Sequence, residues 1–264
     1  MTNKDNIITE LVETGSDISG SVAGAVIGGL VAGPSGAIIG GASGPFLTRI
    51  FKKVGTEIKN RFISPREEVR IGAVYGFAIN KIQQNIKDGQ TIRNDSFFEN
   101  RESKRADSEE IFEGVILGAQ KEYEERKVKY LGNLYGNICT NDKIIREHAN
   151  QLIKITNNLS YRQLCILQLF VEKWNENHNF KFRVKLDIPK IETSDIIIEI
   201  RDLQQRGLIN IISRWKDIDD NSKPIETDDI NLTETGLFYS EMLSLNEIPL
   251  EELKKLNSLL KIID

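Results

Sequence analysis

The chain has 264 residues, of which 39% are hydrophobic and 28% charged, and its formal net charge is -4 at pH 7. This balance is typical of a globular protein of two or three compact units, and it disfavours a function that depends on a strongly basic surface. The two cysteines, Cys139 and Cys165, lie in apolar helical contexts and are predicted to be buried thiols in a reducing compartment.

The first distinctive segment is a charge-free, glycine-rich stretch from Ile18 to Thr48, which follows a short predicted helix at 2–12. The acidic residues before the stretch do not match the positive start of a secretory signal. Two trios of glycines in the stretch have a spacing of four residues: Gly20, Gly24 and Gly28, then Gly36, Gly40 and Gly44. This spacing places each trio on one helix face, where a second backbone can approach closely.

A turn at Pro34 predicts that the stretch folds as a helical hairpin. Each arm would be roughly 20 Å long, against about 30 Å for the core of a bilayer. Two interpretations follow. In the first, the hairpin inserts partly into a membrane, or spans it only after oligomerisation or a conformational change; in the second, it is buried against protein. The pattern resembles the glycine-zipper hairpins of bacterial membrane and toxin proteins.

A basic helix is predicted from about Phe46 to Phe62, directly after the hairpin. Five of its cations form a flank that could face anionic lipid: Arg49, Lys52, Lys53, Lys59 and Arg61. Such a flank favours contact with the inner face of the cell membrane. The alternative is an ordinary solvated helix face.

The next part is predicted to be helical. Pro65 starts one helix and Gly89 ends it, and a polar loop follows from Gln90 to Arg105. The spacing of Asp107 and Glu110 predicts a capping box that opens one long helix to about residue 138. Its predicted core positions are Ile111, Val115, Leu117, Tyr123, Val128, Leu131, Leu134 and Tyr135. A further helix is predicted over 142–159.

The last third has the element order of a winged helix. Ser160 and Gln163 form a second capping-box match, and a second helix runs from Ser194 to Gly207. A strand at 208–215, a turn-rich tip, a return strand at 230–236 and a closing helix follow. This order resembles winged-helix domains over 160–243, and a last amphipathic helix follows Pro249.

DNA binding by this domain would use four polar side chains of its second helix, Arg201, Gln204, Gln205 and Arg206. Acidic residues on the same helix and a predominantly acidic tip at 217–229 disfavour contact with phosphate. We therefore favour a winged helix that contacts protein over one that binds nucleic acid.

Catalytic and cofactor motifs are not evident. The two histidines, His148 and His178, stand in polar contexts without metal-ligand spacing. Gly28 and Gly33 have the outer spacing of a phosphate-binding loop, but Pro34 occupies the position of its lysine. The chain is predicted to be non-enzymatic, with no cofactor and no metal.

Two runs between 124 and 170, EERKVKYLGNLYGNI and ANQLIKITNNLSYRQLCILQLF, resemble bacterial abortive-infection alpha-type proteins. The resemblance implies a role in anti-phage defence. The predicted fold is mainly α, in four parts: an N-terminal region with the hairpin (1–62), a helical domain (63–159), an α+β winged-helix domain (160–245) and a C-terminal helix (246–264).

The leading functional prediction is a defence effector that acts through oligomerisation and a membrane-active hairpin. Its expected partners are other copies of itself or an operon-encoded protein, together with inner-membrane lipid. It is expected in the cytoplasm, at the inner face of the cell membrane. The alternatives are a winged-helix DNA-binding regulator and a soluble scaffold or inhibitor subunit of a defence complex.

Overall fold

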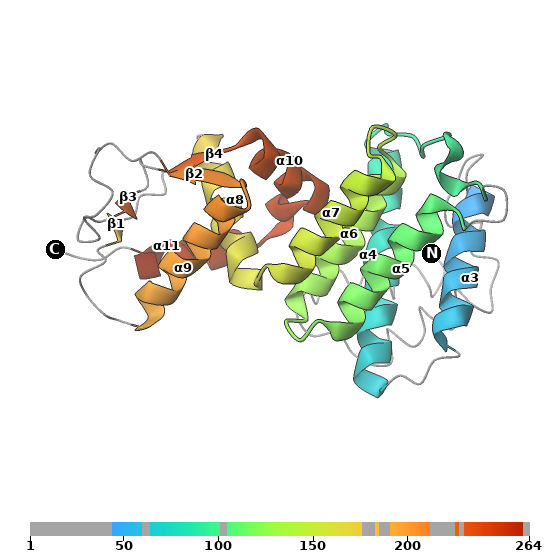
Figure 1. The fold of residues 1–264 in the computed structure, drawn as a ribbon, viewed down its shortest axis with the longest axis horizontal. Coiled ribbons are helices and arrows are strands. Elements are labelled where there is room, and N and C mark those ends of the chain that lie inside the picture. Colours follow the sequence, from blue (N-terminus) through green and yellow to red (C-terminus); the bar gives the residue numbers. More distant parts are fainter. Residues whose placement is uncertain are drawn as a thin grey trace. The chain divides into compact units, whose positions relative to one another are not determined.

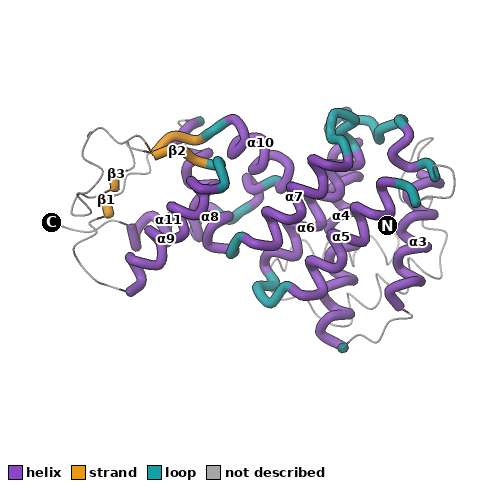
Figure 2. Tube along the Cα trace, in the orientation of Figure 1, coloured by secondary structure: helices purple, strands orange, loops and turns teal. Residues whose placement is uncertain are grey.

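The computed structural model describes residues 44–59, 64–100, 105–175, 183–184, 191–211, 225–226 and 230–260. Helices account for 76% of these residues, so the predicted mainly-α class is confirmed (Figure 1). Figure 2 shows the few strands among the helices. The chain divides into two compact units, Met1–Asn158 (unit 1) and Leu159–Asp264 (unit 2). The predicted helix at 2–12 and residues 18–43 of the predicted hairpin lie outside the described residues.

The described part of unit 1 is a bundle of helices that lie side by side (Figure 1). They are α3 (Gly44–Lys59), α4 (Pro65–Lys87), α5 (Asp107–Lys121), α6 (Arg126–Cys139) and α7 (Arg146–Asn158), with a 3₁₀ turn, η2 (Ser96–Phe98), between α4 and α5. α4 packs mainly against α6 and also contacts α5. α5 in turn contacts α3 and α7, so it connects the outer helices of the bundle.

Four aromatic rings meet at the centre of unit 1. Phe51, Tyr75, Phe112 and Tyr135 come from four different helices, and each is at most 1% exposed. Their neighbouring ring centroids are between 4.4 and 5.9 Å apart, in tilted or edge-on arrangements that favour aromatic pairs. The Tyr75 hydroxyl donates to the Phe51 carbonyl at 3.2 Å, which satisfies its buried polar end.

Local signals account for several helix ends in unit 1. Pro65 occupies the first turn of α4, as predicted, and Ser64 completes a capping box with Glu67. Gly89 follows the end of α4 with a φ of +88°, a left-handed conformation that favours glycine and confirms the predicted stop. Both cysteines are free and buried, as predicted. Burial raises the pKa of the Cys139 thiol to about 12.

The predicted single helix over 107–138 is wrong, because the chain breaks between α5 and α6. In the break, the buried carboxylate of Glu122 accepts from Lys127 at 2.5 Å and from the Glu124 backbone amide at 2.9 Å. Tyr123 therefore lies in a loop and is 85% exposed instead of in the core. The predicted capping box at Asp107 is also wrong, since Ala106 is the cap and makes no side-chain bond.

The buried face of α5 differs from the predicted one at a single position. Leu117, a predicted core position, is only half-buried, whereas Phe112 and Ile116 are fully buried. The other predicted core positions are buried as expected: Ile111, Val115, Val128, Leu131, Leu134 and Tyr135. The buried apolar residues of α5 follow helical spacing, and Leu117 lies at the edge of their face.

Two glycines spaced by four residues make a close contact between α6 and α4. Gly132 and Gly136 of α6 face α4. A Cβ added at Gly132 would lie 2.5 Å from the Phe77 Cβ, and one added at Gly136 would lie 2.6 Å from the Lys81 Cβ. The small-residue spacing that marks the N-terminal stretch thus also serves helix packing inside the folded protein.

Unit 2 is arranged around one central helix, α8 (Tyr161–Trp174), which contacts α9, β4, α10 and α11. The remaining elements are β1 (Arg183–Val184), α9 (Ile191–Gln205), β2 (Ile209–Ile211), β3 (Ile225–Glu226), β4 (Ile230–Leu232), α10 (Glu234–Leu243), η4 (Leu245–Glu247) and α11 (Leu250–Leu260). β2 pairs antiparallel with β4, with Ile209 opposite Leu232, and β1 pairs antiparallel with β3. Most of the predicted acidic tip lies outside the described residues.

Capping and turn residues position the helices of unit 2. The capping box of Ser160 and Gln163 is present at the start of α8, as predicted. Gly207 has a φ of +72° directly after α9 and confirms the predicted end of that helix. Thr233 caps α10 by accepting from the Gly236 amide at 2.9 Å, and its hydroxyl lies 2.6 Å from the Gly207 carbonyl. These contacts tie the start of α10 to the end of α9.

Candidate membrane-facing and partner-facing surfaces

The helix that follows the glycine-rich stretch is fixed in unit 1 by its apolar face. Leu47, Ile50, Phe51 and Val54 lie on one side of α3 and are at most 1% exposed. Withdrawing four such side chains from the core would cost about 6–12 kcal/mol. α3 therefore cannot insert this face into lipid while unit 1 stays folded.

Two of the five predicted lipid-facing cations contact protein. The Arg49 guanidinium donates to the Phe98 carbonyl at 2.9 Å, and Lys53 forms an ion pair with Glu109 at 2.6 Å. Lys52 is exposed, Lys59 is the last residue of α3, and Arg61 lies outside the described residues. The predicted flank is thus partly used for anchoring the helix.

The contact between Lys53 and Glu109 stabilises the fold, because the Glu109 carboxylate is buried. Its side chain is only 1% exposed, and the Arg105 Nε lies 3.6 Å from the same carboxylate oxygen, Oε2, that Lys53 contacts. A buried carboxylate is costly unless cations and hydrogen bonds surround it. Its Oε1 atom has no hydrogen-bond partner among the described residues, so Lys53 supplies a large part of the compensation.

Of the glycines predicted to form the hairpin, only Gly44 is described, and it is the first residue of α3. Gly20, Gly24, Gly28, Pro34, Gly36 and Gly40 lie outside the described residues. The charge-free stretch continues into α3 without a linker, because the two overlap from Gly44 to Thr48. Whatever the stretch contacts, its C-terminal end is attached to the core of unit 1.

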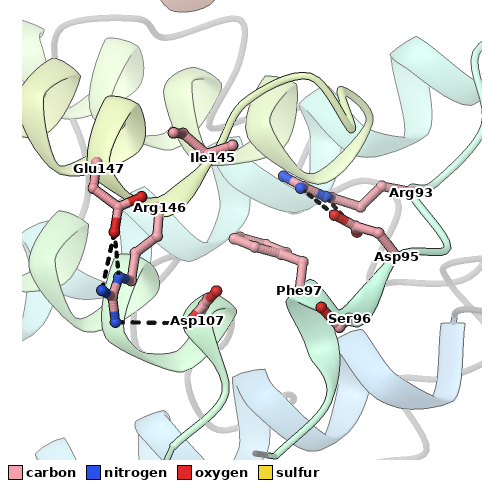
Figure 3. Close-up of a pocket in the computed structure, with 8 residues that line it drawn as sticks. All are labelled: Arg93, Asp95, Ser96, Phe97, Asp107, Ile145, Arg146 and Glu147. Carbon is pink, nitrogen blue, oxygen red and sulfur yellow. Dashed lines mark hydrogen bonds and ion pairs between the residues drawn. The ribbon is translucent and has the colours of Figure 1, made fainter.

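A small polar cavity of about 220 Å³ lies between η2 and the starts of α5 and α7 (Figure 3). Arg93 is almost fully buried beside it and donates to Asp95 at 2.5 Å and to the Ile144 carbonyl at 2.9 Å. Hydrogen bonds from Arg93 hold the pKa of Asp95 below its usual range. Across the cavity, Arg146 pairs with Glu147 at 3.0 Å.

The charged groups of this cavity thus bind one another. Its volume is also below the roughly 300 Å³ from which small-molecule sites usually start. We interpret the network as the contact that holds the loop before α5 against the bundle. The polar composition of 90–105 predicts a loop, and a single arginine within it gives no sign in the sequence that it will be buried.

The residues predicted for DNA contact lie at the C-terminal end of α9. Arg201 and Gln205 are exposed and Gln204 is half-buried. Arg206 donates to Asp202 at 2.8 Å, and the Gln163 amide donates to the same carboxylate at 2.8 Å. Burial raises the pKa of Asp202, but these hydrogen bonds outweigh it, so that the net pKa is lowered. Arg206 is therefore engaged within unit 2.

Further hydrogen bonds connect α9 to the start of α8. Glu199 accepts from the Ser160 hydroxyl at 2.8 Å and from Arg162 at 2.6 Å. With Glu199 and Asp202 turned toward α8, the outward face of α9 presents Asp195, Ile198 and Arg201. Ile198 is the apolar member of this face and is 65% exposed.

The exposed isoleucine is not among the predicted site residues, although the sequence contains a sign of it, because Ile196, Ile197 and Ile198 are consecutive. Consecutive residues are about 100° apart around a helix, so three in a row cannot all enter one core. In the structure, Ile196 and Ile197 are buried and Ile198 is not.

Comparison with known proteins gives no family assignment: no family model, no curated protein and no solved structure matches the chain. In the described ranges, every helix is too short or too polar to cross a bilayer. The same ranges contain no group of three or more histidine, cysteine, aspartate or glutamate side chains placed to hold a metal ion.

Proposed function

We propose that the chain is a bacterial defence effector of the abortive-infection type, which acts on the inner membrane through the glycine-rich segment at 18–48. The observation that carries the proposal is the direct continuation of this charge-free segment into α3, whose apolar face is buried in unit 1. Unit 1 is then a rigid base, and the segment before it is the part that meets lipid or another protein.

The glycine trios suggest how the two arms of the segment pack. In the described fold, glycines spaced by four residues allow α6 to approach α4 closely. The same spacing in the segment supports a hairpin whose arms pack tightly on each other or on the arms of other copies, and membrane action requires this packing. Since each arm is shorter than a bilayer is thick, membrane action requires several copies or a changed conformation.

In this proposal, unit 2 binds other copies of the chain or a partner protein. The order of α8, α9, β2, β4 and α10 supports a winged helix, the fold predicted from sequence. At its second helix, α9, Arg206 donates a hydrogen bond to Asp202, and the side chain of Ile198 is exposed. An exposed isoleucine is suited to a protein partner and contributes nothing to binding phosphate. The DNA-binding regulator is therefore the weaker alternative.

Liposome flotation of the full chain tests the proposal. The chain is expected to float with vesicles that contain anionic lipid, and Gly24→Leu combined with Gly40→Leu should abolish flotation, because leucine blocks the close approach on each glycine face. The matched control is Ala25→Leu combined with Ala37→Leu, which adds the same side chains next to those faces. In cells, the glycine variant should also lose membrane depolarisation while the alanine variant keeps it.

Two results would replace this function with an alternative. A chain that never floats, but co-purifies with the product of a neighbouring gene, would support the soluble scaffold. Salt-dependent binding to duplex DNA that is lost in Arg201→Glu combined with Arg206→Glu would support the regulator. If both glycine and alanine variants keep full flotation and depolarisation, the hairpin mechanism is wrong.

A further inference from the structure

The central part of α4 is buried on every side. All residues from Ile71 to Ile79 are buried, and this run makes more than two turns of helix, so no side of it is open to solvent. A helix that is buried all round needs a neighbour on each of its faces. Among the described elements of both units, however, α4 packs extensively on α6 and α5 alone.

These two neighbours lie on adjacent sides of α4. The α6 side carries Val74 and Phe77, since a Cβ added at Gly132 of α6 would lie 2.9 Å from the Val74 carbonyl oxygen and 2.5 Å from the Phe77 Cβ. The α5 side carries Tyr75, whose ring centroid is 4.7 Å from that of Phe112.

A third side of α4 carries Val69, Gly72 and Gly76, and we call it the α4 glycine face. All three residues are buried. Both glycines lie about 160° around the helix from Val74, which faces α6, and Gly76 lies about 100° from Tyr75, which faces α5. The burial of the α4 glycine face therefore has no source among the described helices.

The length of the chain indicates what covers this face. The ranges of unit 1 outside the description are 1–43, 60–63 and 101–104. The four residues at 60–63 reach at most about 14 Å from Ser64, whereas Gly76 lies roughly 18 Å along α4 from that residue. The range 101–104 leads into α5, on a different side of α4. Residues 1–43 are the range long enough to line the face.

The chemistry of the face matches the glycine-rich part of that range. The face has no charge, and a charged group buried on it would lose its hydration without a partner. Residues 1–17 contain several charged side chains, whereas 18–43 contain none. Gly72 and Gly76 also have the four-residue spacing of the glycine trios, which allows two helix backbones to approach closely.

The attachment of the segment keeps it within reach of this face. α3 continues the segment directly, and the carbonyl of Phe51 in α3 accepts from the Tyr75 hydroxyl of α4 at 3.2 Å. Gly44, where α3 begins, is about 10 Å along the helix from Phe51. The C-terminal end of the segment is therefore held near α4.

We propose that one arm of the glycine-rich segment, within 18–43, packs on the α4 glycine face and is held there until the segment meets a membrane. An arm in this position buries its apolar surface against protein, so it must leave α4 before it can enter lipid. The holding role rests on the proposed function. The packing on α4 does not, because it exists without a membrane.

Disulfide crosslinking of the full chain without lipid tests the packing. Val69→Cys on the α4 glycine face and Val74→Cys on the α6 side are a matched pair, since both replace a buried valine of α4. Each is combined in turn with one substitution in the segment: Ser21→Cys, Ala23→Cys, Ala25→Cys, Ala32→Cys, Ala37→Cys or Ala42→Cys. A disulfide requires Cα atoms within about 7 Å. Val69→Cys should therefore crosslink with at least one of the six, at least tenfold faster than Val74→Cys does with any of them.

The native cysteines are buried, and the unchanged chain measures their background reaction. If Val69→Cys crosslinks with none of the six, or no faster than Val74→Cys, the inference is wrong. The chain that crosslinks fastest then tests the holding role. When oxidised it should not float with anionic vesicles, and when reduced it should float like the unchanged chain, which also shows that the variant is folded.

The two parts of the inference can fail separately from the proposed function. Equal flotation of the oxidised and reduced chain would overturn the holding role. A chain that crosslinks in solution, while the unchanged chain never floats, would refute the membrane mechanism and support the packing on α4.

Discussion

Replacing Lys53 with glutamine should destabilise unit 1, whereas the same replacement at the adjacent Lys52 should not. Lys53 lies 2.6 Å from Glu109, whose carboxylate is 1% exposed, while Lys52 is exposed to solvent. Both substitutions remove one positive charge from the predicted lipid-facing flank. They therefore separate a structural role of the flank from a membrane role.

The expected magnitude follows from what Glu109 would lose. Removing one partner of a fully buried ion pair typically costs about 3–5 kcal/mol. Lys53 is 40% exposed and Arg105 stays within 3.6 Å of the same carboxylate, so solvent and the second cation compensate in part. We expect a loss of about 1–2 kcal/mol for Lys53→Gln. For Lys52→Gln we expect a change within about 0.5 kcal/mol.

Urea denaturation of the full chain, followed by circular dichroism, gives the free energy of unfolding for each variant. Combining Lys53→Gln with Glu109→Gln should recover part of the loss, because the glutamine leaves no buried charge without a partner. Equal unfolding free energies for the two lysine variants would refute this account of Lys53. On vesicles with anionic lipid, Lys52→Gln should weaken flotation, since that side chain remains free to face headgroups.

Two further predictions concern local contacts of unit 1. Gly132→Ala should destabilise the fold by about 1–3 kcal/mol, because the new Cβ would lie 2.5 Å from the Phe77 Cβ. Gly114→Ala is its control: the nearest atom would be 3.4 Å away, so the better helix propensity should stabilise by up to about 1 kcal/mol. Hydrogen bonds from Ser64 lower the pKa of Glu67 to about 2. A lowered pKa stabilises the fold above the unfolded value near 4.5, and this contribution is lost as pH falls toward 2. Stability should therefore decrease less steeply over that pH range in Glu67→Gln; parallel curves would contradict the assignment.

The signals that predicted structure correctly were local ones. Ser160 with Gln163, Gly89, Gly207 and Pro65 mark helix ends through bonds or backbone angles that involve only a few neighbouring residues. Because these interactions lie within one turn of the chain, the sequence alone contains them. Apolar periodicity, which also depends only on neighbouring residues, predicted most of the helices of both units.

The errors arose where a distant residue decides the outcome. The break before α6 depends on Glu122, which is bonded to Lys127 and, through its carbonyl, to Arg70 of another helix. Without those contacts, helical periodicity continues through residue 125 and places Tyr123 in the core. The apolar face of α3 illustrates the same limit, since periodicity predicts a buried face but not whether protein or lipid buries it.

The surface of α9 shows why counting charges was not sufficient to predict its partner. The three acids and two arginines of this helix region disfavour DNA. However, Glu199, Asp202 and Arg206 form ion pairs within unit 2, so their charges are partly neutralised before any partner binds. What remains outward is one acid and one base around Ile198. If α9 contacted duplex DNA through Arg201 alone, the logarithm of affinity would change with the logarithm of salt by a slope of only about -0.9. A helix face this weak for phosphate, with an exposed isoleucine between one acid and one base, favours a protein partner over nucleic acid.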